Sequence, residues 1–136
     1  MIPTPSLAVT LSSHAAGARP VAVAIVMHYE MQCNWPGPGV LAIRFPGSMV
    51  LPRRLASSAV LVDKRAASGA VTVAGRTVSV PLPQRPRIMC DLMGPGTLTV
   101  SFSRAAKLGN PKAAGSYSVL ATHGSDSGTG RVVIRS

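Results

Sequence analysis

The sequence predicts an all-β domain, and three observations lead to this prediction. Val, Gly and Pro supply 16, 13 and 12 of the 136 residues, a composition typical of short β-branched strands separated by turns. Glu occurs once, at Glu30, and charged residues make up only 13% of the chain, which excludes a helical bundle or a coiled coil. The hydrophobic fraction of 46% excludes intrinsic disorder, because a disordered chain has too little apolar surface to bury.

In the first half of the chain, period-two alternation and Pro/Gly turns define the strands. Leu7, Val9 and Leu11 share one face of the first strand, and Val and Ile alternate with Ala in the second. The third begins after a Gly-Pro-Gly turn and stops at Pro46, and the fourth is a short Val-Leu-Val run. The predicted strands are residues 6–12, 21–28, 40–45 and 59–63.

The second half opens on a hairpin. Two runs with Val at every second position flank Gly75, so we expect them to pair as adjacent antiparallel strands. Leu98, Val100 and Phe102 alternate in a later strand, and two further β-rich runs finish the chain. The predicted strands are residues 70–74, 76–82, 97–103, 115–122 and 130–135, with single helical turns possible at 52–58 and 103–108.

Nine strands in a chain of this length predict one sandwich or barrel. We expect the domain to span residues 7–136, preceded by an extended arm at residues 1–6. Pro3 and Pro5 stiffen this arm, and we expect it to contact another chain, either a second copy or a host surface.

A series of turn and core motifs runs through residues 41–119. It includes Ile43-Arg44-Phe45-Pro46, Leu51-Pro52, Val60-Leu61-Val62, Val71-Thr72-Val73-Ala74-Gly75, Leu82-Pro83, Leu108-Gly109-Asn110-Pro111 and Ala114-Gly115-Ser116-Tyr117. This series resembles the immunoglobulin-like β-sandwich repeats of bacterial secreted, surface-layer and adhesin-type proteins. The resemblance implies a single immunoglobulin-like antiparallel β-sandwich of about seven to nine strands. It also implies a structural or adhesive module without an active site.

The signature positions have physical roles in turns and core. Asn110-Pro111 favours turn initiation, and Gly115 lets the chain re-enter a strand. The Tyr117 ring is expected to pack inside, with its hydroxyl at the rim near a backbone partner. The signature residues are Phe45, Pro46, Gly75, Asn110, Pro111, Gly115 and Tyr117.

The charge balance is strongly basic. Fourteen Lys and Arg against four Asp and Glu give a net charge of +10, which favours an anionic partner such as an acidic surface or polymer. The alternative is that these charges only keep an acid-poor surface soluble. The docking candidates, all expected in loops, are Arg53, Arg54, Lys64, Arg65, Arg85 and Arg87.

No constellation of catalytic residues is recognisable, so we predict a protein that is not an enzyme and needs no cofactor. His14, His28 and His123 are far apart in the sequence and lack the spacing of metal ligands. Four carboxylates are too few to favour two-carboxylate chemistry. Cys33 and Cys90 are candidates for a disulfide, and two separate buried thiols are the alternative.

These observations lead to three hypotheses of function. The first is a structural or adhesive module of an extracellular or cell-surface assembly, acting through self-assembly or a protein partner. The second is a virion component, a capsid decoration or fibre protein docking through a basic face. The third and weaker one is a nucleic-acid-binding β-domain, which an aromatic content of only 4% does not favour. No apolar run approaches the ~20 residues of a membrane span, and residues 1–18 contain no Lys or Arg for an export signal.

Overall fold

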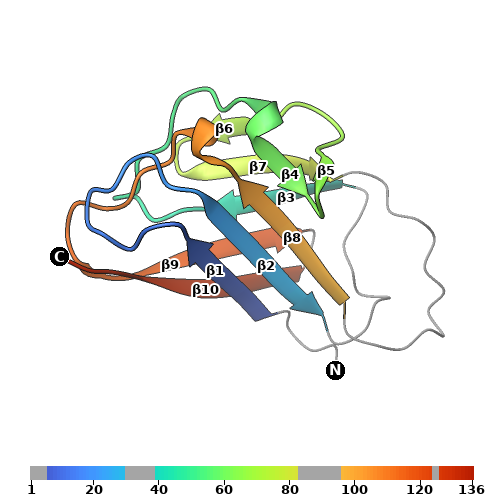
Figure 1. Cartoon of the computed structure of the whole chain (residues 1–136). Helices are drawn as coiled ribbons and strands as arrows, with labels where there is room; N and C mark the ends of the chain where they lie inside the picture. Colours follow the sequence, from blue (N-terminus) through green and yellow to red (C-terminus); the bar gives the residue numbers. More distant parts are fainter. Residues whose placement is uncertain (1–5, 30–38, 83–95, 124–125) are drawn as a thin grey trace.

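The computed structural model describes residues 6–29, 39–82, 96–123 and 126–136, which form two five-stranded antiparallel sheets packed face to face (Figure 1). The first sheet has the order β1-β2-β8-β4-β5, and the second has the order β10-β9-β3-β7-β6. The all-β sandwich predicted from the sequence is therefore confirmed. The strands of the first sheet are β1 (Ser6–Leu11), β2 (Val23–Tyr29), β8 (Gly96–Phe102), β4 (Val60–Val62) and β5 (Arg65–Ala66). Those of the second are β10 (Asp126–Ile134), β9 (Gly115–His123), β3 (Gly39–Arg44), β7 (Thr77–Leu82) and β6 (Thr72–Ala74).

Each of the nine predicted strands overlaps one strand of the structure. The predicted hairpin is the β6–β7 pair, in which Ala74 lies opposite Thr77 and Val73 opposite Val78. Gly75 has a φ of +60° in the two-residue loop, a conformation that a primed hairpin turn requires. The prediction missed β5, because two exposed residues carry no readable alternation. The single turns are 3-10 helices at Ser57–Ala59 (η2) and Arg104–Ala106 (η3), so the first turn begins later than expected.

The arm and the domain boundary are only partly within the described residues. Ser6, which the sequence interpretation placed both at the end of the arm and at the start of the first strand, is the first residue of β1 and lies opposite His28. Residues 1–5 lie outside the described part of the chain.

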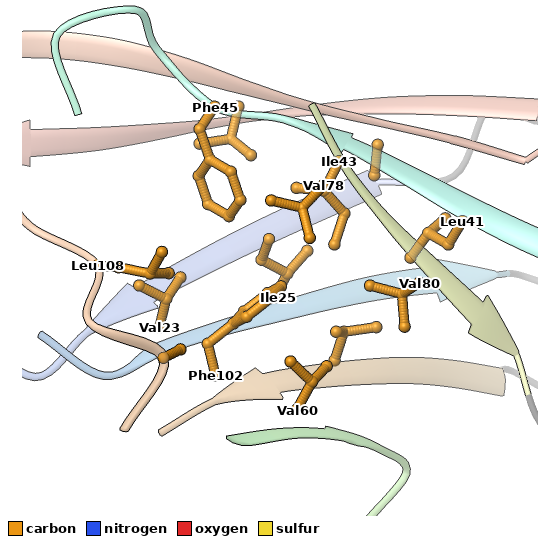
Figure 2. Close-up of a cluster of buried hydrophobic side chains, with 14 of the residues drawn as sticks. Val23, Ile25, Leu41, Ile43, Phe45, Val60, Val78, Val80, Phe102 and Leu108 are labelled. Carbon is orange, nitrogen blue, oxygen red and sulfur yellow. The ribbon is translucent and has the colours of Figure 1, made fainter. Parts of the chain in front are cut away.

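Alternate residues of both sheets point into one apolar core (Figure 2). Phe45, just after β3, meets Phe102 at the end of β8 edge to face, with ring centroids 5.8 Å apart and an interplanar angle of 76°. This geometry is favourable for aromatic pairs, and it joins one sheet to the other. Burying each large aliphatic side chain of this core contributes about 1.5–3 kcal/mol. The fully buried members include Ile25, Leu41, Ile43, Val60, Val78, Val80, Leu98 and Val100.

The two sheets approach each other closely where β1 lies against β10. A Cβ atom added at Gly130 would lie 2.8 Å from the backbone oxygen of Leu7 and 3.1 Å from Cγ2 of Val9. Only a residue without a side chain allows β10 to pass so near the backbone of β1. A backbone bridge also joins the two sheets at this edge, since Ala15 in the β1–β2 connection pairs in parallel with Arg135, just after β10.

Asn110 fixes the connection between β1 and β2. Its side chain is 1% exposed, and Nδ2 donates hydrogen bonds of 2.9 Å to the backbone oxygens of both Ser13 and Ala15. Its backbone N–H also donates to the oxygen of Ala18, at 2.9 Å. One side chain thus replaces the ladder bonds that an irregular connection cannot form for itself.

Tyr117, on β9, closes the turn that precedes its own strand. Its ring packs against the core, and its hydroxyl donates a 2.7 Å hydrogen bond to the backbone oxygen of Ala113. The turn between Asn110 and β9 is therefore held at both ends by a side chain.

Substitution Tyr117→Phe should lower the free energy of unfolding by about 1 kcal/mol, because it removes one hydrogen bond and retains the ring. Urea denaturation followed by circular dichroism measures the difference. An unchanged midpoint with an unchanged slope would show that the hydroxyl does not stabilise the turn.

Candidate functional site

A basic groove runs beside β6, the edge strand of the second sheet. The groove has a volume of about 360 Å³. It forms because the segment after Pro52 passes alongside the residues that lead into β6. The lining residues are Arg53, Arg54, Leu55, Ser57, Ala70, Val71, Thr72 and Val73.

The groove combines positive charge with an apolar base. Arg53 and Arg54 are exposed, whereas Leu55 and Val71 are each only 6% exposed and belong to the core. The backbone N–H of Val71 donates a 3.0 Å hydrogen bond to Oγ of Ser57, which joins the two walls at one point. Two guanidinium groups above an apolar base are suited to an anion that also has apolar surface.

Lys64 and Arg65 belong to a different part of the surface, the β4–β5 hairpin. Asp63 and Lys64 have φ angles of 49° and 67°, the left-handed pair that a type I′ turn requires. Asp63 fixes this hairpin to β8, because its N–H donates to the oxygen of Thr99 at 2.8 Å and its Oδ1 accepts from the N–H of Thr99 at 2.9 Å. Lys64 lines a separate groove of about 260 Å³ with Asp63, Thr99 and Ser101.

The structure thus places the two described basic pairs in different surroundings. Arg85, Arg87, Cys33 and Cys90 lie outside the described residues, so their docking roles and the disulfide stay predictions.

The outer face of the first sheet carries a third groove, which the sequence interpretation missed. It has a volume of about 380 Å³, and Leu61 of β4, which is 41% exposed, contributes to it. Strands β1, β2, β4 and β8 contain no Asp, Glu, Lys or Arg. The signal that could have revealed it is the outward-facing set of residues in each alternating strand. These residues are small and uncharged, whereas charged residues are usual on a solvent-exposed face. The lining residues include Thr10, Ala22, Ala24, Ser58, Leu61, Ser101 and Ser103.

The signature residues lie in the core and in turns. Phe45 is buried, the oxygen of Pro46 accepts a bond from the N–H of Met49 at 3.0 Å, and that of Pro111 accepts from Gly17 at 2.8 Å. Gly115 has a φ of +155°, which L side chains rarely adopt.

The histidines do not come together within the described part of the chain. His14 Nδ1 lies 2.8 Å from the backbone oxygen of Val133, so it donates a hydrogen bond there. His28 is exposed near the end of β2. Among the described residues there is no group of three His, Cys, Asp or Glu side chains that could hold a metal ion. None of the described helices has the length and apolarity needed to cross a membrane.

The structure is therefore an all-β sandwich with a basic groove beside β6 and, over β1, β2, β4 and β8, an outer face without charged residues. No protein-family model and no curated protein matches the sequence, so the resemblance to immunoglobulin-like repeats stays a prediction. Among solved structures, the chain is similar to the crystal structure of BslA, described as a bacterial hydrophobin. The two share 18% sequence identity and a TM-score of 0.58, over 97% of this chain and 98% of that one. At this identity the similarity shows a common fold.

Proposed function

We propose that the protein is a non-enzymatic structural module that assembles with copies of itself at a surface outside the cell. The single observation that carries this proposal is the match to BslA over nearly the whole of both chains. We take the description of that protein as a bacterial hydrophobin as support for a structural rather than a catalytic role. Strands β1, β2, β4 and β8 of this chain contain no charged residue, which fits a surface for assembly.

The uncharged face of the first sheet is our candidate for the contact between copies. A net charge of +10 makes two molecules repel each other, and this repulsion is weakest when the surfaces that meet carry no charge and salt screens the charges elsewhere. The face formed by β1, β2, β4 and β8 satisfies this condition. Its small side chains also let a second sheet approach closely, as in face-to-face sheet packing.

An immunoglobulin-like arrangement within the sandwich is part of the proposal. The orders β1-β2-β8-β4 and β10-β9-β3 match the A-B-E-D and G-F-C orders of that fold, with the β6–β7 hairpin added beside β3. The Tyr117 hydroxyl bonded to Ala113, four residues upstream, has the geometry of a tyrosine corner. Both features support the module class that the sequence motifs implied.

Substitution Leu61→Glu should prevent assembly, because it places a charge in the groove that Leu61 lines on the uncharged face. We expect wild-type protein to form a film at an air–water interface, visible by electron microscopy of the lifted layer and by a fall in surface tension. The variant should remain monomeric by light scattering and should form no ordered film.

Val133→Glu is the matched control. Val133 is 53% exposed on β10, in the other sheet, so it accepts the same charge outside the proposed contact. Equal loss of assembly in both variants would contradict the assignment of this face. A wild-type protein that neither self-associates nor adsorbs would contradict the proposed function itself.

A further inference from the structure

We propose that the basic groove beside β6 binds an extended acidic peptide, which adds to the second sheet as a further strand. This inference is independent of the proposed self-assembly, because it concerns a different sheet and a different partner. It rests on three observations. Among the described residues, the outer edge of β6 pairs with no further strand, Arg53 and Arg54 line the groove beside it, and the Ser57 hydroxyl already accepts the N–H of Val71.

The hydrogen-bonding register leaves one residue of β6 with its backbone groups directed outward. Ala74 and Thr77 close the two-residue hairpin loop, so they form a hydrogen-bonded pair. The next pair, Val73 and Val78, is then of the non-hydrogen-bonded type. The N–H and C=O of Val73 therefore point away from β7, toward the groove.

The adjacent outward position shows that this edge accepts a partner. Val71 is two residues before Val73, so its N–H points to the same side, and the Ser57 hydroxyl accepts it at 3.0 Å. Within the described residues, the N–H of Val73 has no comparable acceptor. An added strand that continues from the position of Ser57 would meet the N–H and C=O of Val73 next.

Charge determines which peptide fits. Arg53 and Arg54 line the same groove, and among the described residues neither has an ion-pair partner. An extended peptide presents every second side chain to one side, so alternating glutamates would reach the guanidinium groups while its backbone pairs with Val73. Four acidic residues in 136 make a second copy of this chain a poor source of such a segment, so the partner is a different protein.

The test uses a fluorescein-labelled eight-residue peptide of alternating glutamate and threonine, titrated with the full chain in low salt. We expect saturable binding, and Arg53→Gln with Arg54→Gln should weaken it about tenfold or more. Lys64→Gln with Lys112→Gln is the matched control, since it removes two exposed charges elsewhere and should change binding less than about twofold. Equal weakening by both double variants would overturn the assignment of the groove.

Strand addition has its own readout. Val73→Pro removes only an N–H that faces away from β7, and it should abolish binding, whereas Val73→Thr keeps the N–H and should retain it. In the wild type, amide exchange measured by nuclear magnetic resonance should slow about tenfold at Val73 when the peptide saturates the groove. The exchange measurement on the wild type tests strand addition even if the proline variant does not fold.

Two outcomes would overturn the proposal. One is unchanged exchange at Val73 with the peptide bound. The other is an acidic polysaccharide that competes as well as the peptide and is unaffected by Val73→Pro, which would leave a simple anion site. The double arginine variant should still form films, and Leu61→Glu should still bind the peptide, so failure of one proposal is separable from failure of the other.

Discussion

Replacement of Asn110 by Ala should lower the free energy of unfolding by about 3 kcal/mol. The substitution removes two hydrogen bonds, each contributing about 1 kcal/mol, and leaves a small cavity at a site that is 1% exposed. The backbone oxygens of Ser13 and Ala15 would lose this donor. Chemical denaturation measures the loss, and we expect the midpoint to fall with little change in slope.

Asn110→Asp separates the hydrogen bonds from the shape of the side chain. The carboxylate is nearly isosteric but has no donor for the two backbone oxygens, so at neutral pH the loss should reach about 4 kcal/mol. Burial beside these oxygens raises the pKa of the introduced carboxyl in the folded state. The folded state then binds more protons than the unfolded state, and the deficit relative to wild type should shrink as the pH falls from 7 toward 4.

Ser12→Ala is the control for Asn110. The Ser12 hydroxyl accepts a single bond from the N–H of Ala22 at 2.9 Å in the same connection, but the site is exposed. We expect a loss below about 1 kcal/mol. A comparable loss in Ser12→Ala and Asn110→Ala would contradict the view that Asn110 anchors this end of the sandwich.

The strands could be predicted from the sequence because their signal is local. Period-two alternation, as in Leu98, Val100 and Phe102, is sufficient to place a half-buried strand. Strand order could not be predicted in this way, because the contact of β2 with β8 joins residues about seventy positions apart and depends on how all the faces pack together. The two-residue strand β5 depends on its neighbour β4 alone and has no pattern of its own.

For the candidate site, too, the local features could be predicted from the sequence and their arrangement in space could not. The basic residues Arg53 and Arg54 are visible in the sequence, and so is the hairpin that contains Val73. Their meeting in one groove is a tertiary event, since no local rule places the segment after Pro52 beside β6. Asn110 was readable as a turn residue, but its bonds to Ser13 and Ala15 span more than ninety residues. The basic residues could thus be predicted from the sequence, whereas their arrangement in one groove could not.

Replacement of Gly130 by Ala should lower the free energy of unfolding by about 2–3 kcal/mol. The new Cβ would lie 2.8 Å from the oxygen of Leu7, and because that atom belongs to the backbone, β1 or β10 must move to relieve the contact. The higher strand propensity of Ala offsets under 1 kcal/mol of this cost. In a thermal melt the transition should shift downward by about 8–12 °C.

Gly69→Ala is the matched control, since its added Cβ would meet only Cγ and Cβ of Pro81, at ordinary distances of 3.6 and 3.8 Å. We expect its stability to stay within about 0.5 kcal/mol of wild type. Amide exchange localises the effect. Gly130→Ala should speed exchange in β1 and β10, while β3 and β7 keep their protection, because the strain arises only where β10 passes the backbone of β1. Equal melting temperatures for the two variants would show that the sheets can separate at this edge without cost, and that the close approach of β1 to β10 does not hold the sandwich closed.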